Sequence, residues 1–217
     1  NIRSNGLIAM KLDEGESLVS VKIARDDEDV FLASKKGKAI RFQVDAIRVF
    51  ASRNSKGVRG MKLAKGDEVM SMSILKREEE DAQGQALLCV SENGMGKRTF
   101  ASEYRTIGRG GQGVVNMKLS DKTGDLVATF PVTDDHQVMI ISDQGQMIRM
   151  PVKDVRTIGR STQGVTLFKV AGGEKVVSVA WLVEDDDEDE VLEGDAVEVD
   201  GVEAADVAEA PEEESQD

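Results

Sequence analysis

The chain has 217 residues, of which 40% are hydrophobic and 32% are charged, and its formal net charge at pH 7 is −13. This length is sufficient for one or two domains with a buried core, and the apolar runs are far shorter than the ~20 residues of a membrane-spanning helix. The single cysteine, Cys89, excludes an intrachain disulfide framework and is typical of a reducing, cytoplasmic setting.

The first segment, residues 1–24, is the second half of a repeat. Its phrase Gly-Leu-Ile-Ala-Met-Lys-Leu recurs in altered form at glycines that lie 51, 56 and 51 residues apart: Gly6, Gly57, Gly113 and Gly164. A period of this size indicates one supersecondary unit that is repeated along the chain. We therefore expect at least half a unit upstream of Asn1, a half blade at 1–24, and whole blades at 25–75, 76–132 and 133–183.

Each whole repeat begins with a predicted β-hairpin. The apolar runs that open the repeats end in a Ser-x-x-Gly turn: 30–33, 87–90 and 138–141. Glycine supplies the positive φ that such a turn needs, and a second strand follows it. The later stretches 58–63 and 69–72 alternate apolar and polar residues, as strands do. Four short strands in ~50 residues are typical of a propeller blade, so we predict an all-β, propeller-like fold.

The end of the chain, residues 184–217, differs in composition from the repeats. It holds eighteen of the 41 acidic residues and none of the 28 Lys and Arg, so residues 1–183 carry 23 acids against 28 bases, about +5. Such a segment buries too little surface to offset its ordering entropy and is predicted to be a disordered acidic tail. The polar insertion at 77–85 is predicted to be a solvated loop between repeats, and a further small insertion lies at 121–124. A basic body with an acidic tail is typical of nucleic-acid binding.

Residues that enzymes use are scarce in this sequence. His136 is the sole histidine and is predicted to lie in a surface turn, while Cys89 is predicted to pack in a buried strand. The sequence has neither a calcium-binding loop nor a phosphate-binding glycine loop with its lysine. We expect no catalytic residue and no metal site, and a hydrolase is the least favoured function.

Arginine and lysine recur at equivalent places, and repetition around an array brings them to one rim. One class of arginine follows the turn glycine by four residues, a second comes seven residues later, and a third precedes the next glycine by four. These side chains either contact phosphate or tie adjacent repeats together; for the first class both interpretations stay open, and for the third phosphate contact is favoured. The candidate DNA-binding residues are Lys35, Lys36, Lys38, Arg41, Arg48, Arg53, Lys56, Lys97, Arg98, Arg105, Arg109, Arg149, Lys153, Arg156 and Arg160.

Aromatic residues discriminate between kinds of nucleic-acid binding. Single-strand and RNA platforms stack bases on exposed rings, whereas Phe31, Phe168 and Trp181 lie in predicted core strands. The sequence therefore predicts sequence-independent contact with duplex phosphates, with the duplex bent around the basic rim.

Four features together resemble the C-terminal domain of the DNA gyrase A protein: the Ser-x-x-Gly turn, the Arg-x-x-x-Gly-Val loop, the Gly-[Val/Leu]-x-x-[Met/Phe]-Lys strand and the acidic tail. The resemblance covers essentially the whole chain and is most specific at 94–119 and 149–170. In that family the repeats form a β-pinwheel whose neighbouring blades exchange strands. The pinwheel wraps duplex DNA in support of ATP-dependent negative supercoiling. The family's basic box, Gln-Arg-Arg-Gly-Gly-[Lys/Arg]-Gly, has no full copy here, and its nearest equivalent is 108–113.

The resemblance implies that residues 1–183 are a fragment of the DNA-wrapping pinwheel. It implies duplex DNA, the remainder of the gyrase A protein and the gyrase B protein as partners, and no membrane. The fragment is expected to be non-catalytic and without a cofactor, while the family's holoenzyme uses ATP and Mg²⁺. Tyr104 is expected to pack or to contact phosphate, since the family's active-site tyrosine lies in another domain.

Two alternatives stay open for the function and two for the tail. The related topoisomerase IV has a similar C-terminal domain with more degenerate blades, and a propeller can also serve as a protein-interaction scaffold. The tail either improves solubility or occupies the basic rim in competition with DNA.

Overall fold

The computed structural model of the chain describes residues 6–77 and 85–183, all of which belong to one compact unit, Asn1–Glu184. Residues 78–84 of the predicted loop at 77–85, and the predicted tail at 184–217, lie outside the described residues. In the described residues, short β-strands and three single turns of 3-10 helix make up the regular structure, which confirms the predicted all-β class. Within the described ranges, no helix has the length and apolar character needed to cross a membrane.

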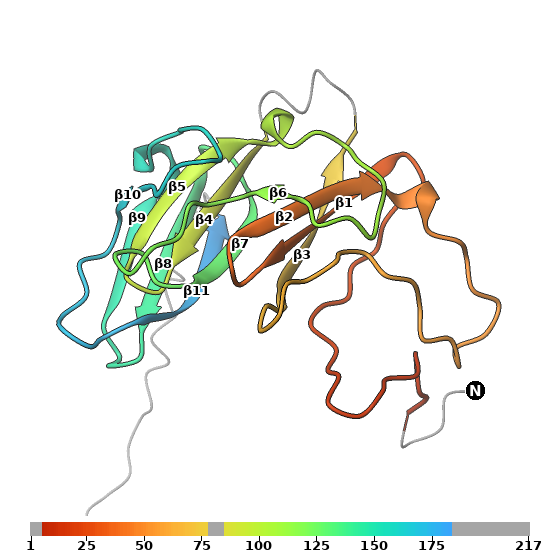
Figure 1. Cartoon of the computed structure of the whole chain (residues 1–217). Coiled ribbons are helices and arrows are strands. Elements are labelled where there is room, and N and C mark those ends of the chain that lie inside the picture. Colours follow the sequence, from red (N-terminus) through yellow and green to blue (C-terminus); the bar gives the residue numbers. More distant parts are fainter. Residues whose placement is uncertain (1–5, 78–84, 184–217) are drawn as a thin grey trace, which may run out of the picture. The chain divides into compact units, whose positions relative to one another are not determined.

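Each whole repeat has the same order of elements: a hairpin, a 3-10 turn, an extended segment that we call the arm, and a last strand (Figure 1). The hairpins are β1 (Glu28–Ser34) with β2 (Lys38–Gln43), β4 (Ala86–Ser91) with β5 (Met95–Phe100), and β8 (His136–Ser142) with β9 (Met147–Pro151). The 3-10 turns are η1 (Val44–Ala46), η2 (Ala101–Glu103) and η3 (Val152–Asp154). The last strands are β3 (Val69–Lys76), β7 (Leu126–Val132) and β11 (Val176–Val183). The arms are residues 47–63, 104–119 and 155–170, and the second and third contain β6 (Val114–Val115) and β10 (Val165–Thr166).

Neighbouring repeats exchange strands, as the family resemblance implies. The strand orders are β3-β1-β2-β6, β10-β5-β4-β7 and β11-β8-β9. One of the two edge strands of each four-stranded sheet, β6 or β10, therefore comes from the arm of the following repeat. Figure 1 shows β6 along β2 and β10 along β5.

The glycines at the hairpin tips make this exchange sterically feasible. Gly37 and Gly94 have φ values of 78° and 72°. A Cβ atom on Gly94 would lie 1.9 Å from Phe168 O, and one on Gly37 would lie 2.6 Å from Met117 O. The bare glycine backbone therefore lets the next arm cross the tip of the hairpin.

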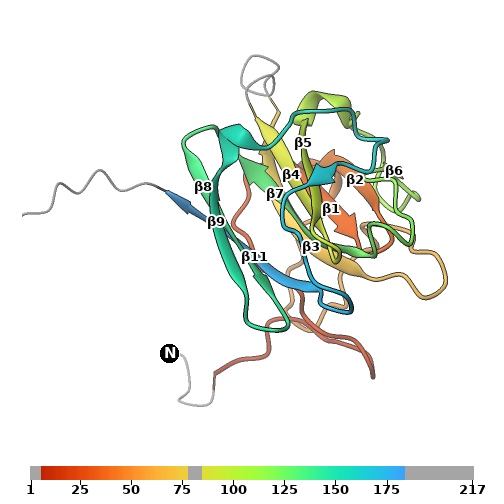
Figure 2. The same ribbon diagram turned by 90° about the vertical axis from the view of Figure 1, so that its left-hand side faces the viewer.

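The cores are shared between repeats. One buried cluster combines Phe31 and Leu75 of the first whole repeat with Leu87 and Tyr104 of the second. The rings of Phe31 and Tyr104 meet edge to face, with centroids 5.0 Å apart. The last strands also touch one another, β3 against β7 and β7 against β11, and Figure 2 shows the three sheets in chain order. Burial of apolar side chains between repeats therefore holds neighbouring repeats against each other.

The strand predicted at 58–63 is wrong, because these residues are extended without forming a strand. Val114 and Val165, at equivalent positions, become strands by pairing with the hairpin of the preceding repeat. The described residues contain no hairpin ahead of β1 that the first arm could join. Strand formation in the arm therefore depends on a distant partner and not on local alternation.

The core position predicted for Trp181 is also wrong. Trp181 lies in β11 but is 48% exposed, whereas Phe31 and Phe168 are buried as predicted. Its indole stacks on the imidazole of His136, with ring centroids 4.7 Å apart. His136 itself begins β8 directly after the turn and is half-buried.

Candidate nucleic-acid interface

Hydrogen bonds fix each arm to the hairpin of the repeat before it. Ile107 N donates to Arg41 O and Ile158 N donates to Arg98 O, both at 2.9 Å. Thr106 also forms an isolated parallel bridge with Arg41. The second and third arms thus continue the exchange of strands beyond β6 and β10.

A second set of backbone bonds joins each arm to its neighbours. These bonds run from Lys11 N to Ser55 O at 3.1 Å, from Lys62 N to Gly111 O at 2.8 Å, and from Lys118 N to Thr162 O at 3.0 Å. Successive arms therefore lie side by side, and we call the surface that they form the arm strip.

One lysine of each repeat lies on the arm strip, and these lysines were not among the sequence candidates. They are Lys11, Lys62, Lys118 and Lys169, which we call the lysine row. All four are exposed, and within residues 6–77 and 85–183 none of their ammonium groups has a hydrogen-bonding or ion-pair partner. The signal was present in the sequence, because the lysine belongs to the phrase that reveals the repeat.

Arg41, from the first class of arginines, ties two repeats together from inside. It is 6% exposed. Its Nε donates to Asp29 Oδ2 at 2.7 Å, and its Nη1 donates to Ala101 O of the next repeat at 3.1 Å. Asp29 is fully buried and also accepts a hydrogen bond from Arg77. This geometry supports the tie interpretation for Arg41.

The other members of the first class differ in their surroundings. Arg98 forms an ion pair with Asp134, and its Nε donates to Val155 O of the third repeat at 2.7 Å. Arg149 is exposed and donates to Gln137 of its own hairpin. Two of the three members thus bridge repeats, and DNA contact by this class stays a prediction.

Lys97 lies inside the unit and holds the third arm. Its side chain is fully buried, and its Nζ donates to Gly159 O at 2.8 Å and to Arg160 O at 2.6 Å. Burial lowers the pKa of this ammonium group to about 8. Burial also raises the pKa of the Cys89 thiol, which lies opposite Lys97 in the β4–β5 register.

Two of the three arginines of the third class, Arg109 and Arg160, use part of the guanidinium to fasten an arm. Arg109 Nη1 donates to Arg59 O at 3.2 Å, and Arg160 Nη1 donates to Val115 O at 3.1 Å. Arg53 is exposed and makes no such bond within the part of the chain that the structure describes. Each guanidinium carries five N–H donors, so the fastened arginines keep donors for a ligand.

Three candidate lysines form exposed ion pairs. Lys35 pairs with Glu68 at 3.0 Å, Lys36 with Asp125 at 2.7 Å, and Lys56 with Asp13. The hydrogen bond to the partner carboxylate raises the pKa of Lys35 and of Lys56. Exposed ion pairs are weak. Because these three lysines are exposed, a phosphate can reach them, but it would have to displace the partner carboxylate.

The remaining candidates are exposed and have no ion pair within the described ranges: Lys38, Arg48, Arg53, Arg105, Lys153 and Arg156. Among them, Arg48 lies over the ring of Phe50, with Cζ 4.6 Å from the centroid. Together with the lysine row, these side chains are the cations most available to a polyanion.

Tyr104 packs in the interior, which settles the choice between packing and phosphate contact. It is 1% exposed, and its hydroxyl donates to Asn116 Oδ1 at 2.6 Å. Asn116 also accepts from Cys89 Sγ at 3.3 Å and donates to Thr129 Oγ1 at 3.1 Å. Burial raises the pKa of the Tyr104 phenol. Tyr104 and Cys89 are therefore parts of a buried polar network.

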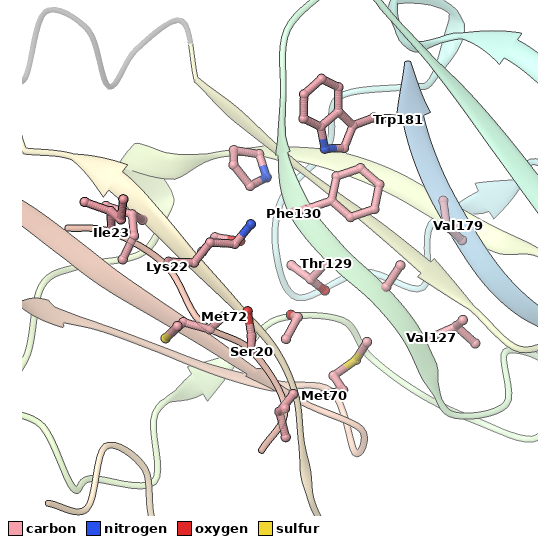
Figure 3. A pocket seen from close by; sticks show the side chains of 16 residues that line it. Ser20, Lys22, Ile23, Met70, Met72, Val127, Thr129, Phe130, Val179 and Trp181 are labelled. Atoms are coloured by element: carbon pink, nitrogen blue, oxygen red, sulfur yellow. The ribbon is translucent and has the colours of Figure 1, made fainter. Parts of the chain in front are cut away.

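A cavity of about 480 Å³ lies among the last strands β3, β7 and β11 and residues 19–23 (Figure 3). Its lining is half polar and half apolar, with Met70, Phe130 and Trp181 among the large side chains, and Lys22 is its one titratable lining residue. The cavity thus presents the amine of Lys22 and several hydroxyl groups, but no second titratable side chain that could act on them as an acid or a base. Within the described ranges, no three potential metal ligands lie together.

The family model described as "DNA gyrase C-terminal domain, beta-propeller" matches residues 1–25, 28–76, 85–133 and 136–180. These four segments correspond to the half repeat and the three whole repeats. Two gyrase A proteins are similar in sequence. The protein of Rickettsia conorii is 42% identical over 91% of this chain, and that of Pseudomonas aeruginosa is 43% identical over 86% of it. The chain spans only 27% and 20% of the length of these two relatives.

Two solved structures share the fold. A DNA gyrase A C-terminal domain matches with a TM-score of 0.71 and 31% identity, over 82% of this chain and 59% of that one. The C-terminal domain of a DNA topoisomerase IV matches with a TM-score of 0.74 and 19% identity, over 82% of this chain and 54% of that one, so this likeness concerns the fold alone. The chain therefore belongs to the family of DNA gyrase C-terminal domains, the β-propeller domain of the gyrase A protein.

Proposed function

We propose that the chain binds duplex DNA without sequence preference and bends it along the arm strip. The observation that carries this proposal is the lysine row: exposed lysines without partners at equivalent places in successive repeats, next to the loops of the third arginine class. A regular series of cations suits a polyanion whose phosphates are also regularly spaced.

The availability of these cations decides how strongly they bind phosphate. A lysine without a partner gives up only water and counterions when it binds, whereas Lys35 or Lys36 must first leave a carboxylate. We therefore assign the main contacts to the lysine row and to the unpaired arginines. Arg41, Arg98 and Lys97 support the interface from inside by positioning the arms.

The elements present favour contact with phosphates over contact with base edges. The described residues contain no α-helix that could enter a major groove, and the one tryptophan stacks on His136. Backbone contact combined with bending is the remaining mode, in which added phosphate contacts offset the cost of bending.

Within a complete gyrase we infer that DNA wrapped on this domain supports ATP-dependent negative supercoiling. The rest of the gyrase A protein, together with the gyrase B protein, would supply the catalytic residues and the sites for ATP and Mg²⁺. The chain itself would act in the cytoplasm as a non-catalytic DNA-binding part.

Binding to a duplex of about 100 base pairs over a salt series tests this proposal, with bending followed by fluorescence transfer between the DNA ends. We expect affinity to fall steeply as salt rises and the ends to approach each other. Failure to bind at low salt would contradict the proposal. DNA binding that does not weaken as salt rises would instead show that the contacts are not made to phosphates.

The same series with a chain that ends at residue 183 tests the role of the tail. If residues 184–217 compete for the basic surface, their removal raises DNA affinity at low salt, where charge attraction is strongest. Equal affinity of the two chains would leave solubility as the role of the tail.

A further inference from the structure

The core of the second repeat is polar where the cores of its two neighbours are apolar. Four positions show the difference, and the sheet registers make them equivalent in the three repeats. The second repeat has Cys89, Lys97, Thr99 and Thr129. The first repeat has Leu32, Ile40, Phe42 and Met72. The third repeat has Ile140, Ile148, Met150 and Val179. All four side chains of the second repeat are buried, so this repeat depends on hydrogen bonds at places where its neighbours depend on apolar burial.

Residues 158–160 of the third arm are held by polar side chains of the second repeat. Thr99 Oγ1 donates to the first of their three carbonyl oxygens at 2.9 Å, and Lys97 Nζ donates to the second and third at 2.8 and 2.6 Å. Glu103 Oε2 accepts a hydrogen bond from Arg160 N at 3.1 Å. Three consecutive carbonyl groups and one amide of the loop are therefore fixed by directed bonds.

The junction between the first and second repeats is built differently. The residues that correspond there to Thr99, Lys97 and Glu103 have side chains without any hydrogen-bonding group. They are Phe42, Ile40 and Ala46. The first two pack in an apolar cluster against Ile107 of the second arm. A buried cation thus holds the arm at the second junction only, and apolar contact replaces it at the first.

The loop that Lys97 holds carries Arg160, an arginine of the third class. Arg160 Nη1 donates to Val115 O of the second arm at 3.1 Å, and the guanidinium keeps further donors for a phosphate. Because its backbone is already fixed, Arg160 loses little conformational freedom when it binds an anion. The position of this guanidinium on the arm strip therefore depends on the bonds that Lys97 makes from inside.

We propose that Lys97 is a positioning residue for the phosphate contact of Arg160, and that this contact is coupled to the charge on the Lys97 ammonium group. The inference rests on the proposed function, because it requires duplex DNA on the arm strip. Hydrogen bonds from a charged donor are about twice as strong as those from a neutral one, so the loop is held most firmly while Lys97 is protonated.

The groups that face Lys97 give the coupling its sign. Cys89 on β4 and Tyr104 in the same polar network stay neutral near pH 8, because burial raises the pKa of both. Burial lowers the pKa of Lys97 to about 8; the Glu103 carboxylate raises it and the Arg160 guanidinium lowers it. A phosphate bound to Arg160 neutralises that guanidinium and so raises the pKa of Lys97. DNA binding then takes up protons above pH 8, and affinity falls as pH rises through this range.

DNA affinity of the full chain at constant low salt, from about pH 7 to about pH 9.5, tests the coupling in the native chain and in Lys97→Met. Ionisation of other groups affects both chains alike, so the ratio of the two affinities isolates Lys97. We expect this ratio to fall about threefold or more across the range, since a rise of about half a pKa unit on binding corresponds to about threefold. Thr99→Val removes an uncharged bond to the same loop and should weaken binding equally at every pH.

Two arginine variants test the route of the coupling. Arg160→Gln should lose most of the pH-dependent fall, because the phosphate contact nearest Lys97 is gone. Arg109→Gln is the matched control and should keep the fall, since Arg109 has the same place on the second arm but Ile40 stands where Lys97 would be.

The outcomes distinguish this inference from the proposed function. A ratio that stays constant with pH, in a chain that binds DNA, would overturn the coupling and leave DNA binding intact. An equal fall in the Arg160→Gln chain would overturn Arg160 as the coupled contact. A native chain that does not bind at low salt and about pH 7 would contradict the proposed function and the coupling with it.

Discussion

Arg41 Nε lies 2.7 Å from Asp29 Oδ2, and the two side chains are only 7% and 0% exposed. The same guanidinium donates to Ala101 O, so this buried ion pair also joins two repeats. A charge pair in this position is stable only while all of its partners are present.

We predict that Arg41→Ala lowers the free energy of unfolding by about 3–5 kcal/mol, because it leaves the buried Asp29 carboxylate with fewer partners. Urea unfolding measures the change. Arg149→Ala is the matched control, since Arg149 has the equivalent position on an exposed edge, and its effect should stay within about 0.5 kcal/mol. Equal effects of the two substitutions would show that the interrepeat bond is unimportant.

This contrast shows what the sequence could predict about the site. The spacing placed Arg41, Arg98 and Arg149 in one class, and the three do occupy equivalent positions on the second strand of each hairpin. Their surroundings differ because the arm of the next repeat covers the first two and leaves the third exposed. A local pattern carries no information on which neighbour covers a residue.

The fold, like the site, was predictable where it depends on local sequence and not where it depends on a distant neighbour. Hairpins follow from short apolar runs and a glycine at the turn, and they were located correctly. A strand after the arm glycine was predicted for every repeat, but it forms only at β6 and β10, which pair with a distant hairpin, and not at 58–63. Lys97 illustrates the same limit: its charge suggested a surface position, while carbonyl oxygens of the third arm hold it inside.

The tip of the second hairpin should tolerate no side chain. We predict that Gly94→Asn costs about 3 kcal/mol or more, because its Cβ would collide with the backbone of Phe168 in the third arm. Gly173→Asn, at φ 86° with nothing within 4 Å, should cost about 1 kcal/mol or less. Thermal unfolding of the two variants measures the difference. Similar melting temperatures would contradict the close crossing of the arm.

Tyr104 provides a spectroscopic test of the buried network, because it is the only tyrosine in the chain. Burial raises the pKa of its phenol, so ultraviolet absorbance should show no phenolate at pH 10 to 11 while the protein stays folded. In guanidinium chloride the same titration should have a midpoint near pH 10. A phenolate signal from folded protein near pH 10 would place the hydroxyl in water.

The buried ammonium group of Lys97 gives a pH dependence with a definite sign. Its pKa is about 8 in the folded chain and 10.5 in the unfolded chain, so between these values the unfolded state binds more protons. Stability therefore rises with pH through this window, by on the order of 2 kcal/mol after allowance for nearby solvent. Below pH 8 both states carry the charge, and its burial opposes folding in full.

Lys97→Met isolates this contribution. The variant lacks the titrating group, so the stability difference between the native chain and Lys97→Met should shift in favour of the native chain from pH 8 to pH 10.5. Urea unfolding at a series of pH values measures it. A difference that stays constant over this window would mean that the ammonium group is not buried.

The last prediction separates the lysine row from the ion-paired lysines. Replacing Lys62, Lys118 and Lys169 by Gln removes exposed cations without partners, so the slope of log affinity for duplex DNA against log salt should become less steep by about 2.7 if each contacts one phosphate. The matched variant removes the same charge by replacing three lysines that pair with acids, Lys35, Lys36 and Lys175. The slope for this variant should change by less than half as much. Each of these lysines must first leave its carboxylate before it can bind a phosphate, so it contributes less to DNA binding than a lysine without a partner. Each replacement also leaves that carboxylate without its counter-charge. Equal changes in slope would show that net charge alone attracts DNA and that the arm strip is not the interface.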